Sequence, residues 1–506
     1  MAVSPYRQLE QEFRRLHAFR GALALLRWDA AVMMPRGCAD VRGEQLAALE
    51  TECHALLITP KVARLLDRAQ ANEQGLDDWQ RANLREMRRQ RDHAIAIPAT
   101  LVGRLARTTA LAGVKWLEAR QQGRFEILAP CLEEVVHLVR DKAALLGQGL
   151  GLAPYDALVD ELSPGMTTAD IDAVFKGLAR RLPGLIREVL DLQADRPVLP
   201  IGGVFPRAKQ RQLAHEIMKT IGFPFERGRL DEGEQPFTGG MPGDVRVVTR
   251  FDTADFLTGL LGTLHETGRA VYYLGLPQTW QEQPVGCDRG LALQESQSEL
   301  LGMIVGRSRA FLRYLQPLLE RHLGVRGAEW EVENLYALLT RVQRSPVRVR
   351  ADELTSPLHM LLRYELEQQL LAGELAARDL PDAWNAALEA RLEIRPANDV
   401  EGCLQDAHWA SGSFGCFPSC VLGTVIAAQL FESLRAGVQG VHEQIARGEF
   451  AGLNGWLRQH VHGFGAKAAI HELIRQVTGK PPGAAAFLRY LEGKYLEDSD
   501  AATEAA

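Results

Sequence analysis

The stretch TLHETGRAVYYLG, residues 263–275, combines a helical pattern with a histidine followed directly by a glutamate. In zinc peptidases, H-E-x-x-H places two histidines one helical turn apart, both facing the metal, with a glutamate base between them. Here His265 and Glu266 are in place, but Arg269 stands where the second histidine would be. Three interpretations follow: a peptidase, a peptidase that has lost its site, or a helix with a chance His-Glu pair.

The surrounding residues predict a helix from Thr253 to Leu274. Asp252 or Thr253 can cap its start, and Gly275 and Pro277 end it. Apolar residues recur at three- and four-residue spacing, which gives the helix one buried face. That stripe consists of Phe256, Leu257, Leu260, Leu261 and Leu264. His265 and Arg269 are four residues apart and therefore share a face.

The same periodicity runs through most of the chain, for example in residues 131–152 and 211–223. Only GDVRVVTRFD, residues 243–252, is typical of a strand, and we expect it to form an edge hairpin with LPIGGVFP, residues 199–206. The sequence predicts a mostly α-helical fold with a small β-hairpin or short sheet near the candidate site. We expect a single large domain over residues 1–506, with an N-terminal helical half of roughly 1–200 and a site-bearing half of roughly 201–506.

Composition narrows the class of protein. The chain has 46% hydrophobic and 24% charged residues and a net charge of −6, which argues against a nucleic-acid partner. No uninterrupted apolar run approaches eighteen residues, so we expect no membrane span. The N-terminus has no apolar signal core, and the seven cysteines contain no C-x-x-C pair. These features favour a soluble protein of the reducing cytoplasm.

A second acidic segment, LALQESQSELLGMIVGRSRAF (residues 291–311), follows the His-Glu helix after one loop. It offers Glu295 where peptidases of this kind supply a third zinc ligand, from a second helix. A lone His-Glu dipeptide is usually chance. The two helices together make a metal-site interpretation stronger.

Several further motifs carry a resemblance to a known family. They are LLRWDAAVMMPRG (25–37), GDVRVVTR (243–250), VRVRADELTSPLHMLLRYELE (347–367), GCLQDAHWASGSFGCFPSCVLG (402–423) and FLRYLEGKY (487–495). With the acidic segment they resemble the carboxypeptidase Taq family, zinc metallocarboxypeptidases that trim amino acids from peptide C-termini. The resemblance runs essentially end to end. It implies a helical fold with a deep groove between two halves, usually as a homodimer.

The resemblance also implies the site. Its metal ligands would be His265, residue 269 and Glu295, and Glu266 would activate the water as general base. The chain departs from the family's pattern at several chemically active positions. These are Gln235, Val248, Arg269, Gln294, Cys416, Cys420 and Ala468. Because a guanidinium cannot ligate a metal, we expect zinc to be absent or weakly bound, with Arg269 paired to Glu295 and Glu266 nearby.

The resemblance also indicates residues for substrate binding, some of them at positions where the chain departs from the family's pattern. Arg246, Arg250 and Arg348 are candidates for gripping a peptide's terminal carboxylate, and Gln235, His408, Cys416 and Cys420 for lining the substrate site. Their polar neighbours could equally be structural, because buried Arg–Asp pairs often only lock a helical core.

Three functions remain open. One is an inactive homologue kept as a protein that binds peptide C-termini or another partner. Another is an active zinc metallocarboxypeptidase with an altered ligand set. The last is a hydrolase with Cys416 or Cys420 as nucleophile, for which the sequence places no paired histidine.

Overall fold

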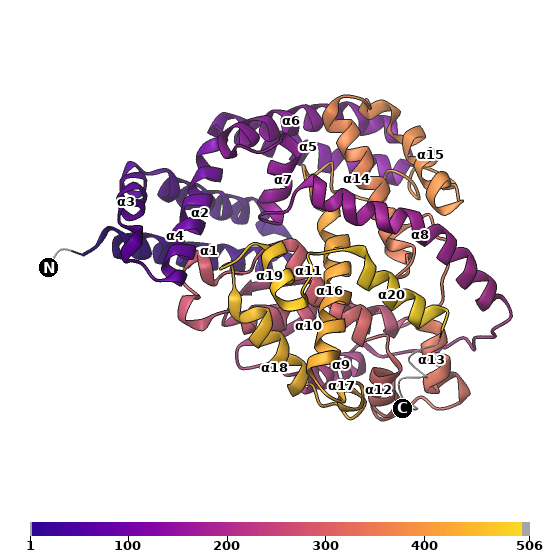
Figure 1. Cartoon of the computed structure of the whole chain (residues 1–506). Coiled ribbons are helices and arrows are strands. Elements are labelled where there is room, and N and C mark those ends of the chain that lie inside the picture. Colours follow the sequence, from indigo (N-terminus) through magenta and orange to yellow (C-terminus); the bar gives the residue numbers. More distant parts are fainter. Residues whose placement is uncertain (1–2, 498–506) are drawn as a thin grey trace.

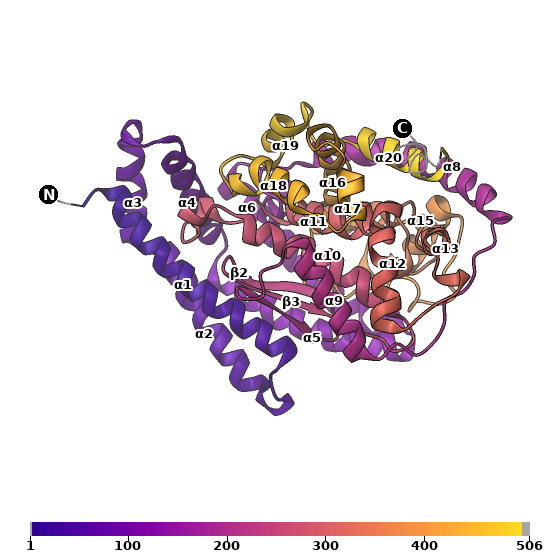
Figure 2. The ribbon, with the colours of Figure 1, turned by 90° about the horizontal axis from the view of Figure 1, so that it is seen from below.

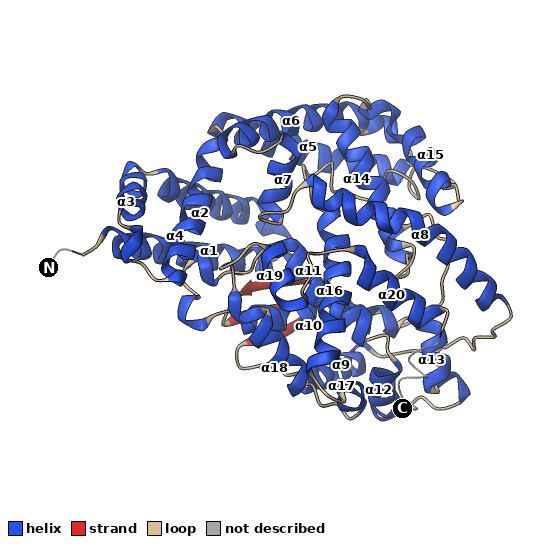
Figure 3. Cartoon of the chain, viewed as in Figure 1, coloured by secondary structure: helices blue, strands red, loops and turns tan. Residues whose placement is uncertain are grey.

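The structure is a computed structural model, and it describes residues 3–497. Helices dominate it (Figures 1 and 3), which confirms the predicted class. The first eight are α1 (Pro5–Val32), α2 (Ala39–Ile58), α3 (Pro60–Ala71), α4 (Asp78–Ala96), α5 (Ala99–Gln122), α6 (Ala129–Leu150), α7 (Pro154–Leu162) and α8 (Thr168–Ala194). The others are α9 (Arg207–Ile221), α10 (Phe256–Gly275), α11 (Leu291–Glu299), α12 (Arg309–Leu323), α13 (Val332–Leu339), α14 (Ser356–Ala372), α15 (Leu380–Leu392), α16 (Phe417–Gly437), α17 (Val441–Ala446), α18 (Ala451–His460), α19 (Ile470–Thr478) and α20 (Ala484–Tyr495).

Helices α1–α4 lie together at one end of the molecule (Figure 1) and have a hydrophobic core of their own. Leu9, Leu66 and Met87 are fully buried in it. Polar bonds join this end to the rest: Asn83 donates to Gln283 (3.2 Å), and Arg289 pairs with Glu86 (2.7 Å). Most of the other helices share one larger core.

A small sheet lies beside α10, with α1 packed against its β2 strand (Figure 2). It consists of β1 (Gly228–Glu232), β2 (Phe237–Met241) and β3 (Asp244–Thr249), in the order β1-β3-β2. Strand β3 pairs in parallel with β1 and antiparallel with β2.

The predicted sheet is therefore confirmed, but its predicted edge position and partner are wrong. Strand β3 is central, and residues 199–206 form no strand. Buried Val245, Val247 and Val248 explain the central place, because their side chains need cover. The tight Pro242–Gly243 connection explains the hairpin with β2, since Gly243 has a φ of 100°.

Helix α10 begins three residues later than predicted, at Phe256. The cap is Asp255, whose carboxylate accepts a hydrogen bond from the backbone N–H of Thr258 (3.2 Å). Asp252 instead accepts from the backbone N–H of Ala254 (2.8 Å) and closes a turn ahead of the helix. The later start leaves His265 and Arg269 in mid-helix, as expected.

Helix α16 is long and apolar enough to cross a membrane by length and composition alone. Within the protein, however, 78% of its apolar window is buried. It packs against α11, α14 and α20, so its apolar character is that of a core helix.

Candidate active site

Two glycines allow the helices of the candidate site to lie unusually close. A Cβ added at Gly268 of α10 would collide with the backbone carbonyl of Gln297 on α11. A Cβ added at Gly423 of α16 would collide with the side chain of Glu295. Small residues at these crossings bring α10, α11 and α16 into backbone contact. The polar side chains at the crossing are consequently held close together.

The crossing brings together His265, Glu266 and Arg269 from α10 with Glu295 from α11. The guanidinium of Arg269 donates from Nη2 to Glu295 Oε1, and its Nη1 lies 3.8 Å from Glu266 Oε2. The Arg269 and Glu295 side chains are only 14% and 13% exposed. Burial disfavours the charged guanidinium, but Glu295 and Glu266 outweigh it and raise the Arg269 pKa above its usual value. The predicted ion pair is confirmed.

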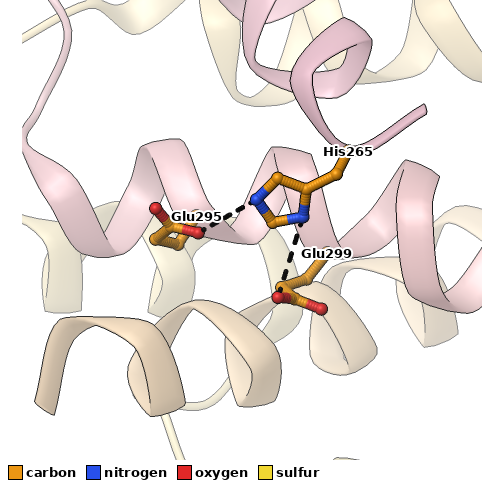
Figure 4. Close-up of side chains that lie close together, drawn as sticks. All are labelled: His265, Glu295 and Glu299. Carbon is orange, nitrogen blue, oxygen red and sulfur yellow. Dashed lines mark ion pairs between the residues drawn. The ribbon is translucent and has the colours of Figure 1, made fainter. Parts of the chain in front are cut away.

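His265 lies between two carboxylates (Figure 4). Its Nε2 is 3.5 Å from Glu295 Oε2, and its Nδ1 is 3.9 Å from Glu299 Oε1. Burial opposes a charged ring, but these carboxylates outweigh it and raise the His265 pKa to about 9. Without a metal the ring is therefore an imidazolium at neutral pH, and a metal ion would have to displace its proton to bind. Glu299 was not predicted to take part in the site; it lies four residues after Glu295 on the same helix face, and this spacing could have identified it.

Glu266, the expected general base, is buried and already bonded. Thr238 of β2 donates its hydroxyl to Glu266 Oε2 (2.8 Å) and also to the Glu266 backbone carbonyl (2.9 Å). Gln235 is exposed just before β2, and the neighbouring Pro236 lies over Gly262 of α10. The sheet thus packs directly against the candidate site, as predicted.

Residues at this crossing could offer ligand atoms to the zinc that the resemblance implies, but in this arrangement they are paired with one another. Candidate ligand atoms of His265, Glu295 and Glu299 lie within 4.8 Å of one another. In a tetrahedral site with bonds of about 2.1 Å, ligand atoms lie about 3.4 Å apart. In addition, one Glu295 oxygen is bonded to Arg269, and the imidazole directs its two nitrogens to different carboxylates. The cationic side chains of Arg269 and His265 offset part of the negative charge of the three glutamates at the site.

Arg348, by contrast, belongs to a second polar cluster built on Asp406. Arg348 donates Nε (3.0 Å) and Nη2 (2.8 Å) to Asp406 Oδ1, while fully buried Arg363 donates Nε to Oδ2 (2.7 Å). His408, 40% exposed, has its Nδ1 3.8 Å from Asp406 Oδ1. Burial would raise the Asp406 pKa, but the two arginines outweigh it and lower the pKa to about 2. Arg363 was missed in the sequence because nothing in its helix pattern separates it from surface arginines.

The other two predicted carboxylate-binding arginines lie elsewhere. Arg246, on β3, pairs with Asp244 (3.0 Å) and stacks over the Trp28 ring of α1, 4.3 Å from its centroid. Arg250 follows β3 and is exposed, and within residues 3–497 it forms no ion pair. In this structure Arg246 therefore ties the sheet to α1.

Cys416 and Cys420 lie at the start of α16, next to the site. Burial raises the pKa of both thiols, to about 12 for Cys420, with Glu295 adding to the effect. A nucleophilic cysteine needs a lowered pKa and a paired base. Both cysteines are free, and the structure thus gives no support to a cysteine hydrolase.

Comparison with known proteins identifies the family. The family described as "Carboxypeptidase Taq (M32) metallopeptidase" matches residues 8–495. This chain belongs to the carboxypeptidase Taq (M32) family. It is 35% identical to thermostable carboxypeptidase 1 of Thermus thermophilus, over 96% of this chain and 97% of the relative. It is 30% identical to carboxypeptidase 1 of Bacillus subtilis, over 96% of this chain and 98% of the relative.

Solved M32 structures share the whole fold. Trypanosoma cruzi metallocarboxypeptidase 1 superposes with a TM-score of 0.95 at 36% identity, covering 97% of this chain and 99% of that one. Pyrococcus furiosus carboxypeptidase gives a TM-score of 0.93 at 31% identity, covering 98% and 100%. The chain thus belongs to a metallopeptidase family, although the side chains at its candidate metal site form ion pairs with one another.

Proposed function

We propose that this chain is an M32 carboxypeptidase homologue that holds no zinc at the family's position, has little or no hydrolytic activity, and binds peptide C-termini. The observation that carries the proposal is the bond between the Arg269 guanidinium and Glu295. It puts a permanent cation on a carboxylate that the metal would need.

The electrostatic cost of metal binding supports this proposal. A divalent ion about 4 Å from a fixed positive charge is disfavoured by about 8 kcal/mol at an effective dielectric of 20. His265 adds a second positive charge, and only two of the family's three ligand positions carry a residue able to ligate. The carboxylates already have compensating partners in Arg269 and His265.

Peptide binding would rest on Arg348 and His408. Both side chains meet Oδ1 of Asp406, and both are partly exposed, at 25% and 40%. Asp406 fixes their positions, and buried Arg363 fixes Asp406 in turn. A guanidinium held in this way can still donate its remaining N–H groups to a terminal carboxylate. Cys420 lies near both groups of residues. Its thiol is close enough to Glu295, Arg269 and Arg348 for the charges of all three to act on its pKa.

The test combines three measurements on the purified chain and on Arg269→His. We expect zinc well below one ion per chain, no release of C-terminal residues from peptides, and retained binding of a peptide that Arg348→Gln weakens. Arg269→His should gain zinc but little turnover, since Cys416 and Cys420 stand where the family offers tyrosines to bind the substrate or oxyanion. Losing one oxyanion donor costs about a hundred- to a thousandfold in rate. Cleavage by the unmodified chain that a chelator abolishes would overturn the proposal.

One observation favours a second candidate, an active metallocarboxypeptidase with an altered ligand set. Glu299 lies near His265 and Glu295, and the three could approach one metal ion after a shift of about 1 Å and loss of the His265 proton. In that case Glu299→Gln would abolish zinc binding and peptide cleavage together. Under the first proposal there is no zinc or activity for Glu299→Gln to remove.

A further inference from the structure

A cavity of about 490 Å³ lies between the loop after α9, the last turn of α10 and α18. Small-molecule sites in proteins typically measure about 300–1,000 Å³. Its apolar wall consists of Pro224, Val271, Leu274, Leu276 and Pro277. Two arginines, Arg227 and Arg458, also line it, and none of the described residues that line it is acidic. The cavity therefore combines an apolar wall with positive charge.

The two arginines have no partners of their own. Neither guanidinium forms a hydrogen bond or an ion pair in the part of the chain that the structure describes. Arg227 is partly buried and Arg458 is exposed. Glu226, next to Arg227 in the sequence, is exposed and does not line the cavity. The carbonyl end of α10 carries only about half an elementary negative charge, so it cannot balance two cations.

Contacts on both sides of the cavity hold the backbone of these arginines in place. The Arg227 carbonyl accepts a hydrogen bond from the backbone N–H of Val245 in β3 (3.0 Å). On α18, Asn454 precedes Arg458 by one helical turn and donates its side-chain amide to the Ile221 carbonyl at the end of α9. The segment that carries each arginine is thus anchored to a neighbouring element.

The charge of Arg458 reaches the end of α10. A Cβ added at Gly275, which lines the cavity, would collide with the His462 ring. Burial lowers the His462 pKa, and the charge of Arg458 lowers it further. Arg458 therefore acts electrostatically on the α10 side of the cavity.

Two guanidinium groups in one cavity match a phosphate better than a carboxylate. One arginine is enough for a carboxylate, because two parallel N–H bonds reach both of its oxygens. A phosphate monoester carries about 1.5–2 negative charges at neutral pH and has more oxygens that accept hydrogen bonds. A second guanidinium from another element supplies the further charge and donors that such a group needs.

We propose that this cavity binds a phosphate group, either as the inorganic ion or as the monoester of a small molecule. Arg227 and Arg458 bind the phosphate oxygens, and the apolar wall packs against the organic part of a monoester. This site shares no residue with the candidate active site or with the Arg348 cluster, and it therefore stands or falls separately from the proposed function.

Calorimetric titration at about 0.15 M salt tests the proposal, because exposed charges more than about 8 Å apart are then largely screened. The probes are phenyl phosphate, inorganic phosphate and benzoate, which carries a carboxylate on the same ring. We expect at least one phosphate probe to bind about tenfold or more tightly than benzoate, since benzoate leaves one guanidinium without an acceptor. Tighter binding of phenyl phosphate assigns the cavity to monoesters, and equal or tighter binding of inorganic phosphate assigns it to the free ion. The proposal is overturned if neither phosphate probe binds, or if the preference over benzoate is smaller than this.

Variants then locate the site. Arg227→Gln and Arg458→Gln should each weaken binding of the tighter phosphate probe about tenfold, because each removes charge-assisted hydrogen bonds. Arg447→Gln is the matched control: Arg447 is exposed just after α17, does not line the cavity, and its loss should leave binding unchanged. Circular dichroism checks folding, and exposed Arg458 keeps the decision possible if Arg227→Gln does not fold. Unchanged binding in a folded cavity variant, or an equal loss in Arg447→Gln, would overturn the proposal.

Discussion

Arg269→Met is the substitution whose effect on stability follows most directly from the structure. It keeps much of the side-chain volume but removes the cation that Glu295 and Glu266 share. Breaking one partner of a buried ion pair costs about 3–5 kcal/mol. Because these side chains retain 13–14% exposure, we expect a loss of about 2–4 kcal/mol. The unfolding entropy of a 506-residue chain is about 1 kcal/mol per kelvin, so Tm should fall by about 2–4 °C.

Scanning calorimetry of metal-free protein at neutral pH measures this shift. Arg447→Ala is the matched control, because its pair with Glu449 is exposed and should leave Tm unchanged. The double variant Arg269→Met with Glu295→Gln should recover part of the loss, since it also removes the orphaned carboxylate. An Arg269→Met protein as stable as the unmodified chain would refute the ion-pair reasoning.

Further outcomes follow from other contacts. Asp406→Asn should lower the free energy of unfolding in urea by about 3–5 kcal/mol, because it leaves buried Arg363 uncompensated; an unchanged midpoint would contradict this. Burial lowers the pKa of His462 to about 3. In the unfolded chain the pKa of histidine is about 6.5, so the stability that the neutral, buried ring contributes is present above about pH 6.5 and is lost as the pH falls. His462→Asn should therefore flatten the fall in stability between pH 6 and 5, by about 1 kcal/mol per pH unit at most, and parallel curves would exclude the effect. Gly268→Ala should destabilise the protein or abolish its folding, as soluble yield and Tm will show, because its methyl group meets the Gln297 carbonyl.

Helical periodicity predicted the fold class well, because the apolar stripes of helices such as α10 persist over several turns. It failed on the sheet. Strand β2, FTGGM, contains two glycines and is partly exposed, so it has neither the alternation nor the β-branched residues that identify a strand. Strand β3 was found through its valines, but the sequence could not show that it would be covered on both edges.

The Arg269–Glu295 pair was predictable because both residues occupy recognisable family positions on two helices. Glu299 was not recognised, since its role depends on how α11 approaches His265 in space. The arginines show the same limit. Arg246 and Arg348 received one predicted role from similar motifs, yet Arg246 packs on Trp28 and Arg348 on Asp406. Motifs locate residues along the chain, and tertiary contacts decide which charge each one meets.

The zinc content of protein purified without chelator tests the central claim most directly. Elemental mass spectrometry should find zinc well below one ion per chain, before and after incubation with zinc followed by desalting. Arg269→His, treated identically, should move toward one ion per chain because it restores the second histidine beside Glu295. One tightly held zinc per unmodified chain would contradict the account, because Arg269 would then have failed to displace the metal.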